Sequence, residues 1–306
     1  MADNITHQQS ADDEIDLREL FSAIWQGKWV IVATTFIFAV AGVFYALSLP
    51  NIYKSEVLLA PVAEDSGLNI PGQLGGLAAL AGVNLGGGGG DKTGLALEIL
   101  KSREFIGRFI QKYDLFVPVM AAEGWNRSDN SLMIDSEVYN AETQKWVREV
   151  KAPFVAKPSV LETYKEFMEF FSVSQDKTSG MVTLSVSHYS PYLAQEWAKM
   201  LVQAINDEMR NRELTEAEDS IAYLNAQIEQ TNIADVRTML FSLIEEQSKT
   251  VMLANVREEY VFKTLDPAIV AEEKAKPARA LIVILAVMLG GMLSALVVLV
   301  RYFNRK

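Results

Sequence analysis

The residues that could carry chemistry are few in this chain of 306 residues, which has two histidines and no cysteine. Without cysteine there can be no disulfide, no thiolate nucleophile and no cysteine-ligated zinc. His188 ends a predicted strand beside Ser187 and Ser190, but no G-x-S-x-G motif and no orienting acid accompany it. The acidic clusters lie on a long predicted helix, where a solvated face is the simpler interpretation. We therefore expect no catalytic residue, no cofactor and no metal site.

A glycine run at 86–90, followed by Asp91, Lys92 and Thr93, has the outline of a phosphate-binding loop. The pattern G-x-x-x-x-G-K-[ST] requires a glycine at position 91, where this sequence has an aspartate. A carboxylate there would repel a phosphate group, so the run is interpreted as a flexible loop. The apolar stretch 74–85 before it is too short to span a membrane, and it is open whether it touches lipid, touches another subunit or forms a loop.

Two long apolar runs determine how the chain is organised. Residues 29–49 and 280–300 each contain 21 residues without a charge, enough for a helix to cross the hydrocarbon core. The residues before the first run are acidic, and the run is longer than the apolar part of a signal peptide, which favours an uncleaved anchor. We expect short tails at 1–28 and 301–306 and one large domain at 50–279.

Charges near the two runs predict the orientation, because lysine and arginine favour the cytoplasmic side. On the side of the tails lie Arg18, Lys28, Arg301, Arg305 and Lys306. On the side of the domain lie Lys54, Lys274, Lys276 and Arg279. This narrow majority predicts cytoplasmic tails and an extracytoplasmic domain. The net charge of −11 argues against nucleic acid as a partner, because phosphate binding needs clustered lysine and arginine.

The segment between the apolar runs mixes strand patterns with helix patterns, which predicts an α+β domain. Strands are expected at 53–62, 168–174, 181–187 and 260–265. Helices are expected at 93–113, 159–167, about 190–229 and about 236–259. The first and last strands adjoin the apolar runs. We therefore expect a small, membrane-proximal mixed sheet with a long helix protruding from it.

The long predicted helix carries apolar residues in steps of three and four, which is the spacing of a coiled-coil seam. The seam consists of Leu214, Ala217, Ile221, Leu224 and Ile228. A break near Asn232 and Asp235 separates it from the second helical stretch. Either a neighbouring subunit covers the seam, or the second stretch folds back onto it.

Small residues repeat every four positions in the second apolar run, a pattern that lets helices approach closely in lipid. The repeat consists of Ala286, Gly290 and Ser294, with a second pair at Gly291 and Ala295. These five positions are predicted to pack transmembrane helices within the oligomer. Pro267 and Pro277 precede the run and are expected to stiffen the entry into the membrane.

Three segments resemble one known family. The opening DEIDLRELFSAIWQGKWVIV, Asp13 to Val32, resembles the N-terminal signature of the Wzz chain-length determinants, the type 1 polysaccharide co-polymerases. LALEILKSREFIGRFI, Leu95 to Ile110, is similar to a segment shared across co-polymerases. The stretch from Leu265 to the end resembles the family's proline-containing entry into the second span, including a glycine pair.

This resemblance implies a homo-oligomer of the bacterial inner membrane, with cytoplasmic termini and a periplasmic domain. It implies that the protein acts with a Wzy-type polymerase to set how many repeat units an O-antigen chain of lipopolysaccharide receives. Membrane lipid and a lipid-linked glycan are further expected contacts. The family is not known to perform bond chemistry, so the protein is expected not to be an enzyme.

Other functions fit the same outline. The polymer could be an enterobacterial-common-antigen-like, capsular or exopolysaccharide chain instead of O-antigen. A two-span sensor needs a cytoplasmic output domain, and a kinase-type co-polymerase needs a kinase domain or a kinase-contacting tail. The six residues after Val300 are expected to leave no room for either. A tethered periplasmic enzyme would show glycan chemistry without any polymerase.

Overall fold

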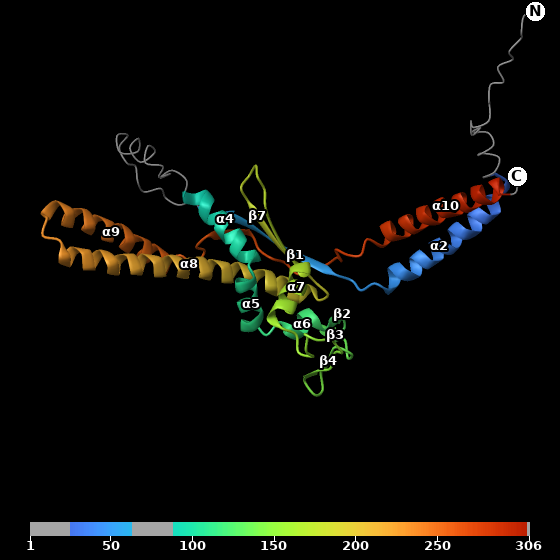
Figure 1. The fold of residues 1–306 in the computed structure, drawn as a ribbon, viewed down its shortest axis with the longest axis horizontal. Helices are drawn as coiled ribbons and strands as arrows, with labels where there is room; N and C mark the ends of the chain where they lie inside the picture. Colours follow the sequence, from blue (N-terminus) through green and yellow to red (C-terminus); the bar gives the residue numbers. More distant parts are fainter. Residues whose placement is uncertain (1–24, 63–87, 305–306) are drawn as a thin grey trace, which may run out of the picture. The chain divides into compact units, whose positions relative to one another are not determined.

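The computed structural model of the chain describes residues 25–62 and 88–304 (Figure 1). It has two compact units, the first formed by Met1–Pro50 together with Lys276–Lys306, and the second by Asn51–Ala275. The apolar stretch at 74–85 lies outside the described residues.

The first unit is a pair of apolar helices packed against each other, α2 (Lys28–Ser48) and α10 (Arg279–Phe303). They coincide with the predicted runs 29–49 and 280–300, and each is long and apolar enough to cross a membrane. Helix α2 ends where Leu49 adopts an extended conformation before Pro50, because proline disfavours helical geometry in the residue before it.

The centre of the second unit is a four-stranded sheet with the order β6-β7-β1-β8. Its strands are β1 (Tyr53–Pro61), β6 (Phe171–Gln175), β7 (Val182–His188) and β8 (Phe262–Asp266). The α+β class is confirmed, but the expected mixed sheet is wrong because every pair in this sheet is antiparallel. The physical reason lies in the connections: β6 and β7 form a hairpin, and a pair of long helices turns the chain so that β8 runs against β1.

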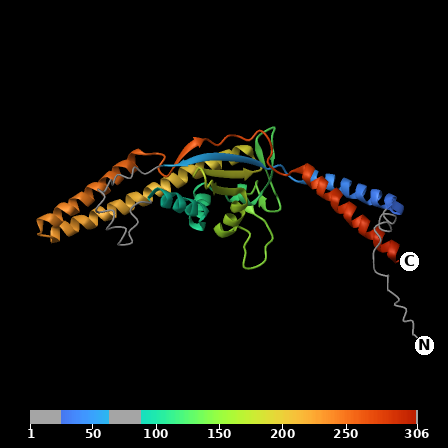
Figure 2. The same cartoon turned by 90° about the horizontal axis from the view of Figure 1, so that it is seen from above.

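One face of this sheet is buried, as the alternation in β1 shows. Ser55, Val57 and Leu59 are buried, while Lys54 and Glu56 are exposed. A strand points successive side chains to opposite faces, so this pattern fixes which face packs on the helices. Figure 2 shows the sheet as a layer with helices against it.

The predicted helix 93–113 is two helices, α4 (Gly88–Lys101) and α5 (Arg103–Lys112). Ser102 between them is extended, and its side chain accepts a hydrogen bond from the N–H of Phe105, which caps α5. Serine is a preferred N-cap residue, so the sequence did contain this signal. Helix α4 also includes Gly88 to Gly90, which were predicted to be part of a flexible loop.

Helix α7 (Val160–Phe170) extends through Met168, which was predicted to begin a strand. The helix α6 (Phe116–Met120) and two small hairpins were not predicted. These hairpins pair β2 (Ala122–Asn126) with β3 (Ser131–Ile134), and β4 (Tyr139–Asn140) with β5 (Lys145–Trp146). Such short strands carry too few alternating residues to produce a period-two pattern.

The long predicted helix is confirmed as α8 (Pro191–Gln230), whose 40 residues span about 60 Å. Ser190 caps it by accepting a hydrogen bond from the N–H of Leu193, and Pro191 occupies its first turn. After three residues, α9 (Ala234–Val256) runs back along α8, and the two lie side by side as a helical hairpin (Figures 1 and 2).

The core of the second unit lies between the buried face of the sheet and helices α5, α7 and α8. Its largest fully buried side chains include those of Trp197, Phe167, Phe262, Leu59, Leu100, Ile106, Leu184 and Leu201. The ring of Phe167 stacks on those of Trp197 and Phe171, with ring centroids 5.7 and 6.1 Å apart. This core fixes the first half of α8 on the sheet.

Candidate functional site

His188 is a core residue. Its side chain is fully buried, and its ring centroid lies 4.8 Å from that of Trp197. Nδ1 accepts a hydrogen bond from the N–H of Ser190 (3.1 Å), so Nε2 carries the proton and donates it to the carbonyl of Pro118 (3.0 Å). Burial lowers the pKa of His188 to about 4, despite these two backbone hydrogen bonds. A neutral ring with both nitrogens engaged is suited to holding the end of β7 to Pro118 and to the N-cap of α8.

Lys92 of the phosphate-loop-like segment forms an ion pair with Glu213 of α8. A P-loop lysine instead points its charge at a phosphate. This pairing therefore ties α4 to the long helix.

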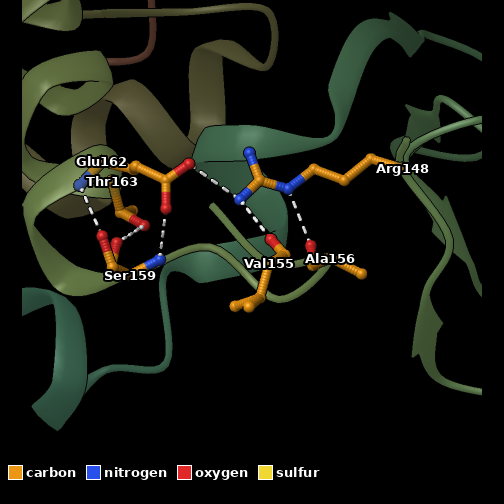
Figure 3. Close-up of polar contacts among 6 residues, drawn as sticks. All are labelled: Arg148, Val155, Ala156, Ser159, Glu162 and Thr163. Carbon is orange, nitrogen blue, oxygen red and sulfur yellow. Dashed lines mark hydrogen bonds and ion pairs between the residues drawn. The ribbon is translucent and has the colours of Figure 1, made fainter. Parts of the chain in front are cut away.

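A partly buried ion pair fixes the segment before α7, as Figure 3 shows. The guanidinium of Arg148 donates to Glu162 Oε1 (2.8 Å) and to the carbonyls of Val155 (3.0 Å) and Ala156 (2.7 Å). Glu162 Oε2 also accepts from the N–H of Ser159, whose side chain caps the helix in return. Burial acts to raise the pKa of Glu162, but the hydrogen bonds from Ser159 and Arg148 outweigh it, and the pKa lies below its usual value.

The seam of the long helix lies where α9 runs along the second half of α8. Ala217 and Ile228 are buried, and Leu214, Ile221 and Leu224 are half-buried. On α9 the buried residues are Leu240 and Ala254. The sequence left open whether a neighbouring subunit or the second helical stretch covers the seam. In the structure the second stretch, α9, folds back onto it.

The side of α9 that faces away from α8 carries an apolar surface that was not predicted from the sequence. Phe241, Met252 and Val256 are 53%, 70% and 81% exposed. Their spacings of eleven and four residues place them on one face of the helix. The sequence did contain an indication of this surface, because these large apolar residues lie opposite Leu240 and Ala254 on the helix. It is an apolar face that α8 does not cover.

The small residues of α10 pack against α2 of the same chain. A β-carbon built at Gly290 would come within 2.7 Å of the Phe38 side chain, and one at Gly42 within 2.6 Å of Ala286. A β-carbon at Gly291 would have room, 3.8 Å from Thr35 Oγ1. Ser294 is buried and donates to the carbonyl of Gly291, while Ala295 is half-buried. The predicted small-residue stripe therefore makes a contact within the chain.

The segment around the predicted entry prolines is held along the second unit. Pro267 follows β8, and the carbonyls of the next two residues accept hydrogen bonds from Gln195 (2.9 Å) and Ser55 (2.7 Å). The N–H of Ala275 donates to the carbonyl of Ile52 (2.8 Å). Pro277 lies just before α10. These bonds restrain the segment through its backbone, whereas the sequence attributed its stiffness to proline alone.

A groove of about 520 Å³ lies between α8 and the segment that leads into β8. Its charged and amide side chains are those of Lys199, Gln203, Asp207, Arg210, Glu258 and Glu259, with Val57, Pro267 and Ala268 adding apolar surface. The groove joins residues more than fifty positions apart in the chain. No pattern along the sequence indicated it.

Asn206, which also lines this groove, fastens the chain where it returns from α9. Its Oδ1 accepts hydrogen bonds from the N–H groups of Tyr260 (3.0 Å), Val261 (2.9 Å) and Phe262 (2.9 Å). Its Nδ2 donates to the carbonyl of Phe262 (3.1 Å). Phe262 is the first residue of β8, an edge strand, so Asn206 pairs backbone groups there that would otherwise be open to another strand.

Comparison with protein families finds two matches. Residues 13–113 match the family described as "Chain length determinant protein" (Wzz). Residues 229–303 match "G-rich domain on putative tyrosine kinase" (GNVR). The first match includes α2, β1, α4 and α5, and the second includes α9, β8 and α10. No curated protein matches the chain.

Two similar solved structures are a "full-length bacterial polysaccharide co-polymerase" and a fragment of WzzB, a polysaccharide co-polymerase from Salmonella Typhimurium. The first is 15% identical over 96% of this chain and 98% of its own, with a TM-score of 0.37. The second is 12% identical over 74% of this chain and all of its own, with a TM-score of 0.23.

In this structure two apolar helices flank one α+β domain, and the Wzz match covers the first of these helices and the beginning of the domain. The chain contains a segment of the chain length determinant family at 13–113 and a GNVR segment at 229–303. The resemblance seen in Asp13–Val32 and Leu95–Ile110 is thereby confirmed, because both segments lie inside the Wzz match.

Proposed function

We propose that this protein sets the modal chain length of a Wzy-dependent polysaccharide in the bacterial inner membrane, with lipopolysaccharide O-antigen as the first candidate. It acts as a homo-oligomer in contact with the polymerase and performs no bond chemistry itself. The match of residues 13–113 to the chain length determinant family carries this proposal.

The geometry of the domain favours a role in binding and assembly. Across residues 25–62 and 88–304, no cluster of three or more histidine or acidic side chains could hold a metal ion. His188 is closed inside the core with both ring nitrogens bonded to backbone groups. What the domain offers instead is surface: a helix about 60 Å long, whose second half pairs with α9, and a groove beside it.

The outward face of α9 supports self-association. Phe241, Met252 and Val256 form an exposed apolar stripe outside the apolar helix pair. Apolar patches that a single chain leaves uncovered commonly mark contacts with another protein. We assign this stripe to the contact with a second copy, and the predicted seam to the contact within the chain. The small-residue stripe of α10 already has a partner in α2.

The orientation belongs to the proposal as well. The termini lie in the cytoplasm and the unit Asn51–Ala275 lies in the periplasm, as the charges flanking the apolar runs favour. A reporter that is active only in the periplasm should work when fused after Asp176 and be silent when fused after Lys306. The opposite pattern would reverse the orientation.

The decisive experiment is deletion of the gene, followed by electrophoresis of the lipopolysaccharide. Loss of the modal ladder with continued polymerisation is the expected result, because the polymerase is a separate protein. Re-expression of the intact chain should restore the ladder. An unchanged ladder, together with unchanged lengths of the other surface polymers, would refute the proposal.

A second candidate function is control of a capsular or exopolysaccharide chain. The match of residues 229–303 to a domain named for its place on a putative tyrosine kinase favours it. Measuring the chain lengths of all surface polymers in the same deletion strain separates the two, because only the polymer that the protein serves should change.

A further inference from the structure

Three aromatic rings meet at the beginning of the long helix. They come from three separate segments: Tyr53 begins β1, Trp125 lies in β2, and Tyr192 lies in the first turn of α8. The ring of Tyr53 meets that of Trp125 edge-on, with centroids 5.5 Å apart, and the ring of Tyr192 lies 6.1 Å from Trp125. Tyr192 is 48% exposed, so this aromatic cluster presents a ring to solvent.

The indole of Trp125 is held in place by the hairpin that carries it. Its Nε1 donates to Asn130 Oδ1 (2.8 Å), and Asn130 sits in the turn between β2 and β3 with a φ of 56°. The ring thus has a fixed orientation, with its polar atom satisfied and the rings of Tyr53 and Tyr192 beside it. Rigid aromatic side chains of this kind give large contact area at low entropic cost.

The aromatic cluster and the groove share one face of α8. Tyr192, Lys199, Gln203 and Arg210 follow each other at spacings of seven, four and seven residues, which places them on a single side of the helix. From Tyr192 to Arg210 the helix rises about 27 Å. Lys199 and Gln203 are exposed, and Arg210 is paired with Asp207. An aromatic surface therefore leads along α8 into a polar groove.

We propose that this face of α8, from the aromatic cluster to the groove, is a binding track for the saccharide chain whose length the protein sets; this inference rests on the proposed function. Pyranose rings present apolar C–H faces that stack on aromatic rings. Their neighbouring hydroxyl groups pair with planar amide, carboxylate and guanidinium groups. The track contains both kinds of group in that order along one helix.

The composition of the groove separates a saccharide from a lipid surface. An aromatic cluster alone would suit the membrane interface, where tyrosine and tryptophan are enriched. The groove, however, carries carboxylates as well as cationic groups: Asp207, Glu258 and Glu259 beside Lys199 and Arg210. Mixed charge with half-apolar walls fits a ligand rich in hydroxyl groups, and its volume lies in the range of small-molecule sites, about 300–1,000 Å³.

The test uses the intact protein in detergent and, as probe, the surface polysaccharide isolated from the encoding strain and released from its lipid by mild acid. Binding is measured by calorimetry for Tyr192→Ala and for its matched control Tyr223→Ala, an exposed tyrosine of α8 outside the track. Gln203→Ala is paired with Gln230→Ala in the same way. Melting curves establish that all four variants are folded.

We expect Tyr192→Ala to weaken binding about tenfold, because buried aromatic contacts dominate binding energy, and Gln203→Ala to weaken it less. Tyr192→Phe should bind like the unaltered chain, and the two controls should as well. Equal affinity of Tyr192→Ala and Tyr223→Ala would overturn the track. So would a lack of binding by the unaltered protein, even where gene deletion abolishes the modal ladder.

The outcomes also distinguish the track from the proposed function. If Tyr192→Ala loses affinity while gene deletion leaves every chain length unchanged, the track stands and the chain-length function falls. If Tyr192→Ala keeps its affinity but changes quenching of the protein's tryptophans by brominated lipid in vesicles, the aromatic cluster contacts the bilayer. That result would also overturn the saccharide track.

Discussion

The two helix pairs of this protein pack in different ways. Helices α2 and α10 meet through small residues, and β-carbons at Gly42 or Gly290 would collide with the opposite helix. Helices α8 and α9 meet through a sparse stripe in which only Ala217, Ile228, Leu240 and Ala254 are buried. The first pair is closely fitted, whereas the second is a long hairpin with half-buried positions along its contact.

The difference shows what exposed apolar residues mean in each pair. On α2 and α10 they are what a lipid environment requires, and close packing of small residues provides the helix contact. On α9 the same kind of exposure at Met252 and Val256 marks the surface that we propose for contact with a second copy. Residues of one chemical type thus have different roles, because the two pairs differ in their surroundings.

The strongest way to break the hairpin is to charge its inner face. Ile221→Asp combined with Leu224→Asp places carboxylates in the contact with α9, where losing apolar burial and desolvating charge should cost more than about 3 kcal/mol. We expect α9 to separate from α8, with the modal glycan distribution lost and polymerisation continuing. Limited proteolysis between α8 and α9 and the glycan ladder provide the two measurements.

The matched control charges the outer face instead, with Phe241→Asp combined with Met252→Asp. These positions are exposed, so the melting temperature of the chain should change little. The oligomer should dissociate in light scattering of the detergent-solubilised protein. An outer-face variant that melts early but stays oligomeric would show that the two faces have been assigned in the wrong order.

The base of the hairpin should be nearly as sensitive as its inner face. Asn206→Ala removes the acceptor of three backbone N–H groups and the donor to the Phe262 carbonyl. Buried groups left without a partner cost about 1–3 kcal/mol each, so we expect a loss of about 3 kcal/mol in the free energy of unfolding after partial relaxation. Thermal melting in detergent tests this. A loss below 1 kcal/mol would mean that water replaces the amide.

Acid should destabilise the second unit and not the helix pair α2–α10, because His188 lies in the second unit. Its pKa of about 4 is below that of the unfolded chain, 6.5, so the unfolded state binds the proton first. The contribution of neutral His188 to the free energy of unfolding is complete above pH 6.5 and is lost as the pH falls toward 4. At pH 5 this loss is about 2 kcal/mol. Glu162 adds to the loss only below its ordinary pKa of 4.5.

Unfolding of the second unit should therefore begin at lower temperature at pH 5 than at pH 7.5, while the helix pair α2–α10 is unaffected. His188→Gln offers a non-titrating side chain, and its melting temperature should be less dependent on pH over this range. The same slope in His188→Gln as in the unaltered chain would assign the acid sensitivity to another group.

The smallest effect concerns the fit between α2 and α10. Gly290→Ala forces a methyl group against Phe38 and should cost about 1–2 kcal/mol, whereas Gly291→Ala has space and should be nearly neutral. Cysteine pairs introduced across the two helices would report their spacing, since the chain has no cysteine of its own. Equal crosslinking in both alanine variants would contradict the close contact at Gly290.

Much of the fold could be predicted from local patterns. The apolar runs, the alternation of β1 and β7, and the cap at Ser190 each depend on residues close together in the chain. Two boundaries were nevertheless misjudged. Ser102 interrupts the helix predicted at 93–113, and α7 continues through Met168 because its apolar side packs on the core.

The candidate sites depended on contacts between distant residues. The spacing in α8 determined that Leu214 to Ile228 form an apolar seam, but only the return of α9 decided that the same chain covers it. The stripe at Gly290 likewise left its partner open until α2 was seen against it. Asn206 and the groove carried no sequence signal, because their partners lie more than fifty residues away. A periodic pattern determines which face of an element is apolar. Burial of that face requires a second segment to pack against it, and only the tertiary structure shows which segment that is.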